Sequence, residues 1–185
     1  MKKFLFVVAA LATSMAASAQ LWVSGGLNIE NTSSWGDDKS LTEWGITPSV
    51  GYALDDALEV GLNFGLSGAS KDDNNVFKFK VAPFARYTFL SEGDFSMFLE
   101  CEVGYENYKL KDQDAEWSFN TTIQPGVKYV LTDNFAMVAK LGGLYYKHNP
   151  GAYNASNSYP FSTTTQNKFG LNIGTNLQFS LVYSF

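Results

Sequence analysis

The chain has 185 residues, with 13 basic and 18 acidic side chains and a net charge of −5. This length suits a single domain. The acidic balance excludes nucleic acid as a partner, because such proteins need a basic stripe. The single cysteine, Cys101, excludes an intramolecular disulfide. Aromatic residues make up 16% of the chain, and most fall on alternating positions, which predicts strands with two different faces.

The N-terminus has the pattern of a secretory signal peptide. Lys2 and Lys3 precede an apolar run over residues 4–12, and Ala17-Ser18-Ala19 form an A-x-A cleavage site. The apolar run is much shorter than the roughly 20 residues that a membrane-spanning helix needs. We therefore predict a signal peptide at residues 1–19 and one mature domain at residues 20–185.

The mature sequence divides into segments in which apolar residues alternate with small or polar ones. In chain order these eight segments cover residues 21–30, 42–54, 58–68, 76–89, 95–105, 117–131, 135–145 and 171–185. The connections after the second, fourth and sixth segments are short turns, and the remaining ones are longer and polar. This regularity predicts an all-β chain that folds as a transmembrane, eight-stranded antiparallel up-and-down β-barrel. Both termini would then lie on the short-turn side, in the periplasm.

Four segments end in a repeated pattern that contains a tyrosine near the last apolar position: Tyr52, Tyr87, Tyr129 and Tyr183. We interpret these tyrosines as one aromatic girdle at the membrane surface. The other girdle would contain Trp44, Phe77, Tyr105, Trp117 and Tyr145. A proline stands four residues before each of the first three tyrosines, at Pro48, Pro83 and Pro125, and predicts a bulge or bend there. The alternative, a soluble sandwich with these aromatics in its core, does not explain four matched strand ends.

The bulky face of the segments is expected to face lipid, because eight strands enclose only enough space for side chains to fill. The opposite face is rich in glycine, serine and asparagine, and it carries charges of both signs. We predict an interior charge network of Glu59, Lys78, Lys80, Arg86, Glu100, Glu102, Glu106, Lys128 and Lys140. The turn near Glu92 would place Lys78 opposite Glu106, and Lys80 diagonal to Glu102 and Glu106. Two interpretations stay open: a plug of ion pairs that fills the barrel, or a gated polar path.

The signal peptide, the eight segments and the terminal Tyr183-Ser184-Phe185 resemble the small eight-stranded outer-membrane β-barrel family. This family includes outer membrane protein X, the barrel domain of outer membrane protein A and porin-like barrel domains. The resemblance implies the cell outer membrane of a Gram-negative bacterium, with lipid and lipopolysaccharide as surroundings. It also implies that the barrel assembly machinery reads the closing strand, at Leu177, Phe179, Leu181, Tyr183 and Phe185.

The sequence contains no pattern that indicates catalysis, a metal or a cofactor. His148 is the one histidine, no H-x-S pattern of lipid A-modifying barrels is present, and no His/Cys cluster suits a metal. The last long loop carries Tyr153, Tyr159 and Phe161 among many Asn, Ser and Thr. Such a surface suits an extracellular ligand or host surface. We predict a non-enzymatic outer-membrane protein with a structural or surface-interaction role. The alternatives are a narrow porin-like channel, a conduit for a small hydrophobic ligand and, less favoured, a lipid A-modifying enzyme.

Overall fold

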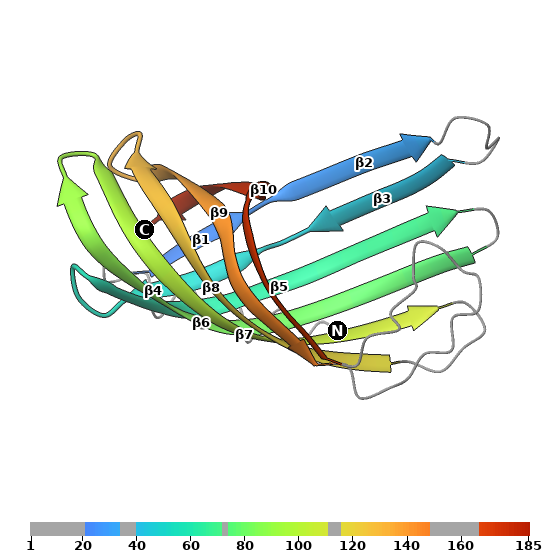
Figure 1. Cartoon of the computed structure of the whole chain (residues 1–185). Coiled ribbons are helices and arrows are strands. Elements are labelled where there is room, and N and C mark those ends of the chain that lie inside the picture. Colours follow the sequence, from blue (N-terminus) through green and yellow to red (C-terminus); the bar gives the residue numbers. More distant parts are fainter. Residues whose placement is uncertain (1–20, 34–39, 72–73, 111–115, 149–166) are drawn as a thin grey trace, which may run out of the picture.

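The computed structural model describes residues 21–33, 40–71, 74–110, 116–148 and 167–185, and the regular structure in them is all β-strand (Figure 1). The signal peptide predicted at residues 1–19 lies outside the described residues. In chain order the strands are β1 (Leu21–Gly25), β2 (Leu27–Ser33), β3 (Ser40–Ile46), β4 (Ser49–Ala53), β5 (Leu58–Lys71), β6 (Asn74–Glu92), β7 (Phe95–Leu110), β8 (Glu116–Val130), β9 (Phe135–His148) and β10 (Asn167–Ser184).

The first two barrel strands are each interrupted once. β1 and β2 are parts of one strand that breaks at Gly26, and β3 and β4 are parts of the next, which breaks at Thr47-Pro48. The breaks face each other: the Gly26 amide donates to the Thr47 carbonyl (3.3 Å), and the Thr47 amide donates to the Gly26 carbonyl (2.9 Å). The ten segments therefore form the eight strands of one antiparallel barrel, which confirms the predicted fold.

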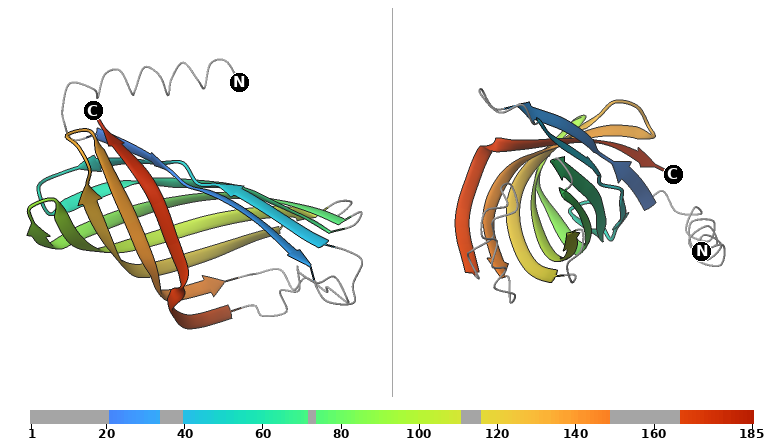
Figure 2. Two further views of the ribbon diagram at one scale, coloured as in Figure 1. Left: turned by 90° about the horizontal axis from the view of Figure 1, so that it is seen from above. Right: turned by 90° about the vertical axis from the view of Figure 1, so that its right-hand side faces the viewer.

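The barrel closes between its first and last strands. β1 pairs with β10 from Trp22↔Ser184 to Gly25↔Leu181, and the Phe185 amide donates to the Leu21 carbonyl (3.1 Å). Beyond these pairs β2 stays paired with β3, and β10 with β9, but in the described part of the chain no pairing joins β2 to β10. The two strands diverge toward the long-loop end (Figures 1 and 2). We call the opening between β2 and residues 167–179 of β10 the seam.

The predicted proline bends occur at two of the three positions. Pro48 lies at the break between β3 and β4, and Pro125 lies within a register shift between β8 and β9. Pro83 keeps regular pairing with Leu62 on β5. The pairing of β6 with β7 shifts register instead between Thr88 and Leu90, close to the turn that joins these two strands.

A bulge in β9 reverses which residues face inward. Ile123 of β8 pairs with Leu144 and Gly126 pairs with Lys140, so β9 holds one extra residue in between, and Gly142 has a φ of 76° there. Met137 therefore faces outward before the bulge, whereas Leu144 and Tyr146 face outward after it. The prediction that Tyr145 belongs to the outer girdle is wrong, because this bulge turns its side chain into the barrel. β10 is also irregular, with residues 174–177 opposite Leu141 alone.

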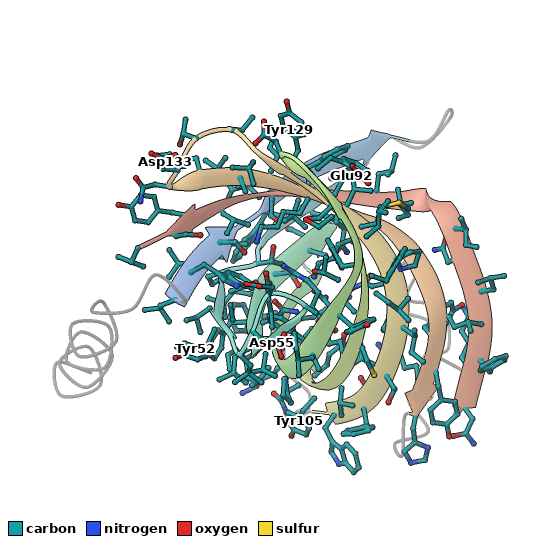
Figure 3. The ribbon with its side chains drawn as sticks, turned by 90° about the vertical axis from the view of Figure 1, so that its left-hand side faces the viewer. Tyr52, Asp55, Glu92, Tyr105, Tyr129 and Asp133 are labelled. Carbon is teal, nitrogen blue, oxygen red and sulfur yellow. The ribbon has the colours of Figure 1, made fainter. Side chains whose placement is uncertain are left out.

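The outward face is mainly apolar on every strand whose side chains the structure describes, and near the long loops β7 also carries the exposed Lys109 on this face. Tyr87, Tyr129 and Tyr183 are exposed near the short turns, and Trp44, Phe77, Tyr105 and Trp117 are exposed toward the long loops. Figure 3 shows the short-turn end, with Asp55, Glu92 and Asp133 at its three turns and the Tyr129 side chain pointing away from the wall. No helix in the described residues is long and apolar enough to cross a membrane.

Candidate functional site: a charged plug and a polar cavity

An apolar layer crosses the barrel in its short-turn half. Its members are buried side chains from five strands: Trp22, Phe84, Phe98, Ala136, Val138 and Val182. Glycines on neighbouring strands make room for the three rings, because a methyl group at Gly51, Gly61 or Gly126 would overlap Trp22, Phe84 or Phe98 respectively. The interior of this half is therefore filled by rings that lie flat against glycines.

Arg86 on β6 lies within this layer and is only 3% exposed. Its Nη1 donates to Oε2 of Glu59 (2.9 Å), and its Nη2 donates to Oε2 of Glu100 (2.9 Å). Its guanidinium carbon also lies 4.4 Å from the centre of the Phe98 ring and 5.1 Å from that of Trp22. Rings and carboxylates together surround the cation, an arrangement that suits the planar guanidinium.

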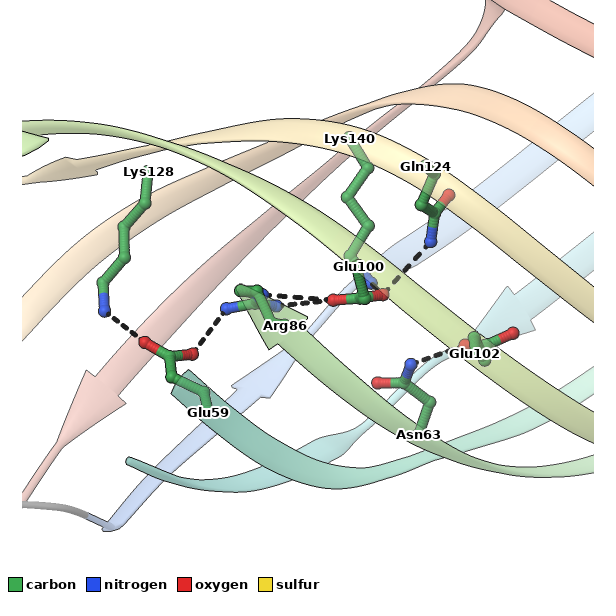
Figure 4. Close-up of polar contacts among 8 residues, drawn as sticks. All are labelled: Glu59, Asn63, Arg86, Glu100, Glu102, Gln124, Lys128 and Lys140. Carbon is green, nitrogen blue, oxygen red and sulfur yellow. Dashed lines mark hydrogen bonds and ion pairs between the residues drawn. The ribbon is translucent and has the colours of Figure 1, made fainter. Parts of the chain in front are cut away.

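Two lysines and a glutamine complete the network around Arg86 (Figure 4). Lys128 on β8 pairs with Glu59 (3.1 Å), and Lys140 on β9 pairs with Glu100 (2.5 Å). The Gln124 amide donates to the same Glu100 oxygen as Lys140 (3.1 Å). Each buried carboxylate thus has at least two partners, which offsets the cost of removing its charge from water. We call Glu59, Arg86, Glu100, Gln124, Lys128, Lys140 and the apolar layer the plug.

A second polar cluster lies farther toward the long loops. Glu102 on β7 accepts from Lys80 (2.5 Å) and from the Asn63 amide (2.6 Å). Glu106, four residues farther along β7, pairs with Lys147 of β9 (2.7 Å) and accepts from the Ser118 hydroxyl (3.3 Å). These pairs join strands β5 to β9 across the interior.

A polar cavity of about 420 Å³ lies beside this second cluster. Charged and polar side chains of β6 to β10 line it, together with two glycines of the β9 bulge: Lys80, Glu102, Asn120, Thr122, Gln124, Gly142, Gly143, Tyr145, Lys147, Lys168, Asn172 and Gln178. Sequence reasoning missed Tyr145, Lys147 and Lys168 as interior residues. The Gly142-Gly143 pair was the available signal, since glycine inside a strand indicates a bulge.

The predicted register between β6 and β7 is wrong by two residues. Lys80, not Lys78, lies opposite Glu106, and Lys78 lies opposite Tyr108 and is exposed. The reason is the turn: Gly93 has a φ of 58°, and the strand shifts register between Thr88 and Leu90. The other members of the predicted interior network make the ion pairs described above. Lys78 alone of that set makes no ion pair with a described residue.

The other predicted functional residues lie apart from the interior. The proposed assembly residues are all exposed: Leu177, Phe179, Leu181 and Tyr183 on the outer face of β10, and Phe185 directly after it. Tyr153, Tyr159 and Phe161 fall outside the described residues. His148 Nδ1 lies 2.6 Å from Oδ1 of Asn167, and its ring packs edge-on against Trp117. Within the described residues no group of three or more His, Cys, Asp or Glu side chains suits a metal.

An apolar outer belt around a filled, charged interior is the arrangement of a membrane-inserted β-barrel. The family model of the outer membrane protein beta-barrel domain matches residues 4–185, and the chain belongs to this family.

Solved structures with a similar fold include Neisserial surface protein A, at 15% identity. That match covers 91% of this chain and 98% of the other, with a TM-score of 0.57. A bacterial polysaccharide outer membrane secretin matches at 12% identity and a TM-score of 0.51, over 88% of this chain and 51% of the other. Both likenesses concern the fold alone. No curated protein matches the chain.

Proposed function

We propose that this protein is a non-enzymatic, non-conducting barrel of the Gram-negative outer membrane. The short turns and both termini would lie in the periplasm, and the long loops would face outward among lipopolysaccharide. The plug carries this proposal. Arg86 and Glu100 are 3% and 0% exposed, and they hold strands β5 to β9 together through shared ion pairs. Ions crossing the barrel would have to displace these pairs and the three rings beside them.

Single-channel recording in a planar lipid bilayer tests the plug directly. The wild-type protein is expected to give no steady conductance. Removal of the plug in a triple variant, Phe84→Ala with Arg86→Ser and Phe98→Ala, is expected to give small, regular current steps if the variant still folds. Glu102→Gln and Lys80→Met change residues of the cavity, and these variants should, like the wild type, give no steady conductance. Steady wild-type steps that change in Glu102→Gln or Lys80→Met would establish the channel alternative instead.

The loops would make the contacts with the surroundings. In this proposal Tyr153, Tyr159 and Phe161 supply aromatic faces for an extracellular ligand or host surface, and rim lysines such as Lys109 meet lipopolysaccharide phosphates. Deleting residues 149–166 should leave the barrel folded, as judged by heat-modifiable migration on gels. The deletion should also reduce the binding of protein-displaying cells to immobilised glycans. Equal binding by the deletion variant would remove the surface-interaction part of the proposal.

A lipid A-modifying activity has no support in the described residues. The contacts of His148 that the structure shows are with Asn167 and Trp117, and they include no serine. Overexpression is therefore expected to leave the mass spectrum of lipid A unchanged, and a new lipid A species that disappears in His148→Ala would overturn this part.

A further inference from the structure

The seam carries the most exposed apolar side chains that the structure describes. Leu27 at the start of β2 is 81% exposed, Phe169 of β10 is 75% exposed, and Leu171, Ile173 and Phe179 are each 62% exposed. Large apolar side chains elsewhere in the described residues reach at most 56%. These five lie beside the seam, where a neighbouring strand covers only one flank of each side chain.

The seam also leaves one edge of β2 and one edge of the first part of β10 without a neighbouring strand among the described residues. β2 pairs on one edge with β3, and residues 167–173 of β10 pair on one edge with β9. In hydrocarbon such an open edge is costly, and irregular backbone at membrane depth occurs only beside protein or a water-filled cavity. The polar cavity borders this edge, because Asn172 and Gln178 line it from the same strand that borders the seam.

One lysine of the cavity makes no ion pair with a residue in the described part of the chain. Lys80 and Lys147 are paired with Glu102 and Glu106. Lys168, near the start of β10, has its Nζ 5.7 Å from the centre of the Tyr145 ring and makes no ion pair with a described residue. Its position at the long-loop end of β10 places the ammonium near one membrane surface. From there Phe169, Leu171 and Ile173 follow on the outer face toward the membrane interior.

We propose that the seam and the cavity together bind a long-chain fatty acid, or another single-chain amphiphile with a carboxylate, from the surrounding lipid. The carboxylate pairs with Lys168 at the cavity, and the acyl chain lies along the outer face of β10 past Phe169 and Ile173, opposite Leu27. A cavity of about 420 Å³ lies in the usual size range for small-ligand sites. The plug fills the barrel on the short-turn side of the cavity, so the protein holds the amphiphile and does not pass it across the membrane. The proposal does not rest on the loop contacts proposed above.

Fluorescence quenching in vesicles of zwitterionic phospholipid tests the proposal. One sample carries an environment-sensitive dye at the seam, through Ile173→Cys in a Cys101→Ser background. The matched control carries the same dye on native Cys101, which is exposed to lipid on β7, away from the seam. A fatty acid brominated on its chain is then added. We expect quenching at residue 173 to saturate at a low mole fraction, whereas quenching at Cys101 should rise in proportion to the bulk concentration.

A variant of Lys168 and a fatty acid without a free carboxylate separate binding at Lys168 from simple partition into lipid. Lys168→Gln should raise the half-saturation concentration at residue 173 at least fivefold, whereas Lys109→Gln, an exposed lysine on the outer face of β7, should not change it. The methyl ester of the same fatty acid should lose the saturable component. Equal, non-saturating quenching at both dye positions would overturn the proposal. Saturation that is insensitive to Lys168→Gln would also overturn it, and so would full displacement by acetate alone, since that indicates an anion site without a role for the acyl chain.

Discussion

Arg86 binds one oxygen of Glu100 twice, through Nη2 at 2.9 Å and Nε at 3.2 Å. The two side chains come from cross-strand neighbours on β6 and β7. Glu100 is fully buried, and its other oxygen accepts from Lys140 and Gln124. Removing either member of the Arg86–Glu100 pair would therefore leave a charge in a place that water does not reach.

Arg86→Ala is expected to lower the free energy of unfolding by about 3–5 kcal/mol, the usual cost of leaving a buried charge without its partner. The double variant Arg86→Met with Glu100→Leu should regain part of that loss, because it also removes the buried Glu100 charge, but it takes the carboxylate partner away from Lys140. Lys78→Met is the control: Lys78 is exposed and makes no ion pair with a described residue, and a substitution of this kind changes stability by at most about 0.5 kcal/mol. Urea unfolding in detergent micelles measures all three. Equal losses for Arg86→Ala and the double variant would show that the charge itself is not the cause.

Gly126→Ala tests the fit between rings and glycines in the plug. The new methyl group would overlap the Phe98 ring and approach the Ala139 carbonyl, and overpacking of this kind costs about 1–3 kcal/mol. Gly25→Ala is the matched control, since nothing lies within 4 Å of its added methyl group, and its unfolding midpoint should stay near that of the wild type. A Gly126→Ala midpoint equal to that of Gly25→Ala would argue against close ring packing.

The bulge at Gly142 predicts opposite environments for two adjacent tyrosines. Tyr145→Cys and Tyr146→Cys, each in a Cys101→Ser background, are labelled with a nitroxide and studied by electron paramagnetic resonance in vesicles. The label at 145 should collide mainly with a water-soluble nickel relaxant from the cavity side. The label at 146 should collide mainly with oxygen dissolved in lipid. The reverse pattern would place the strand in the regular alternation that the sequence suggests.

Deleting Phe185 tests the proposed assembly role of the closing strand. The ring packs edge-on against Tyr183, 5.1 Å between centres, at the end of the outer face. The deletion is expected to reduce insertion into the outer membrane of cells severalfold while leaving folding into detergent nearly unchanged. Phe169→Ala removes an exposed ring at the other end of the same strand and serves as the control. If both variants insert equally well, the terminal aromatic is not a recognition element.

Alternation alone predicted the eight strands, because each keeps one apolar and one small or polar face along most of its length. It did not predict that Trp22, Phe84 and Phe98 fill the interior, since the space for them depends on glycines of neighbouring strands. That match becomes visible only when the cross-strand register is known. The register itself depended on the turn at Gly93 and the shift near Leu90, which no alternation pattern reveals.

The site was partly predictable for the same reason. Glu59, Arg86 and Glu100 each lie on the small or polar face of a strand with regular alternation, so the sequence predicted that all three face the interior. Tyr145 and Lys147 lie beyond the β9 bulge, where one extra residue reverses the faces. The seam had no signal in the sequence, because β2 and β10 each show normal alternation and differ only in what they pair with.

The facing breaks at Gly26 and Thr47 separate β2 and β3 from β1 and β4. Below them the plug ties β1 and β4 to the rest of the wall, whereas above them the β2–β3 hairpin is held by β5 on a single side. Native-state hydrogen exchange should therefore find β2 and β3 opening together at a lower free energy than β1 and β4. The β2–β3 hairpin can then open without disturbing the plug, because no member of the plug lies on either of its strands.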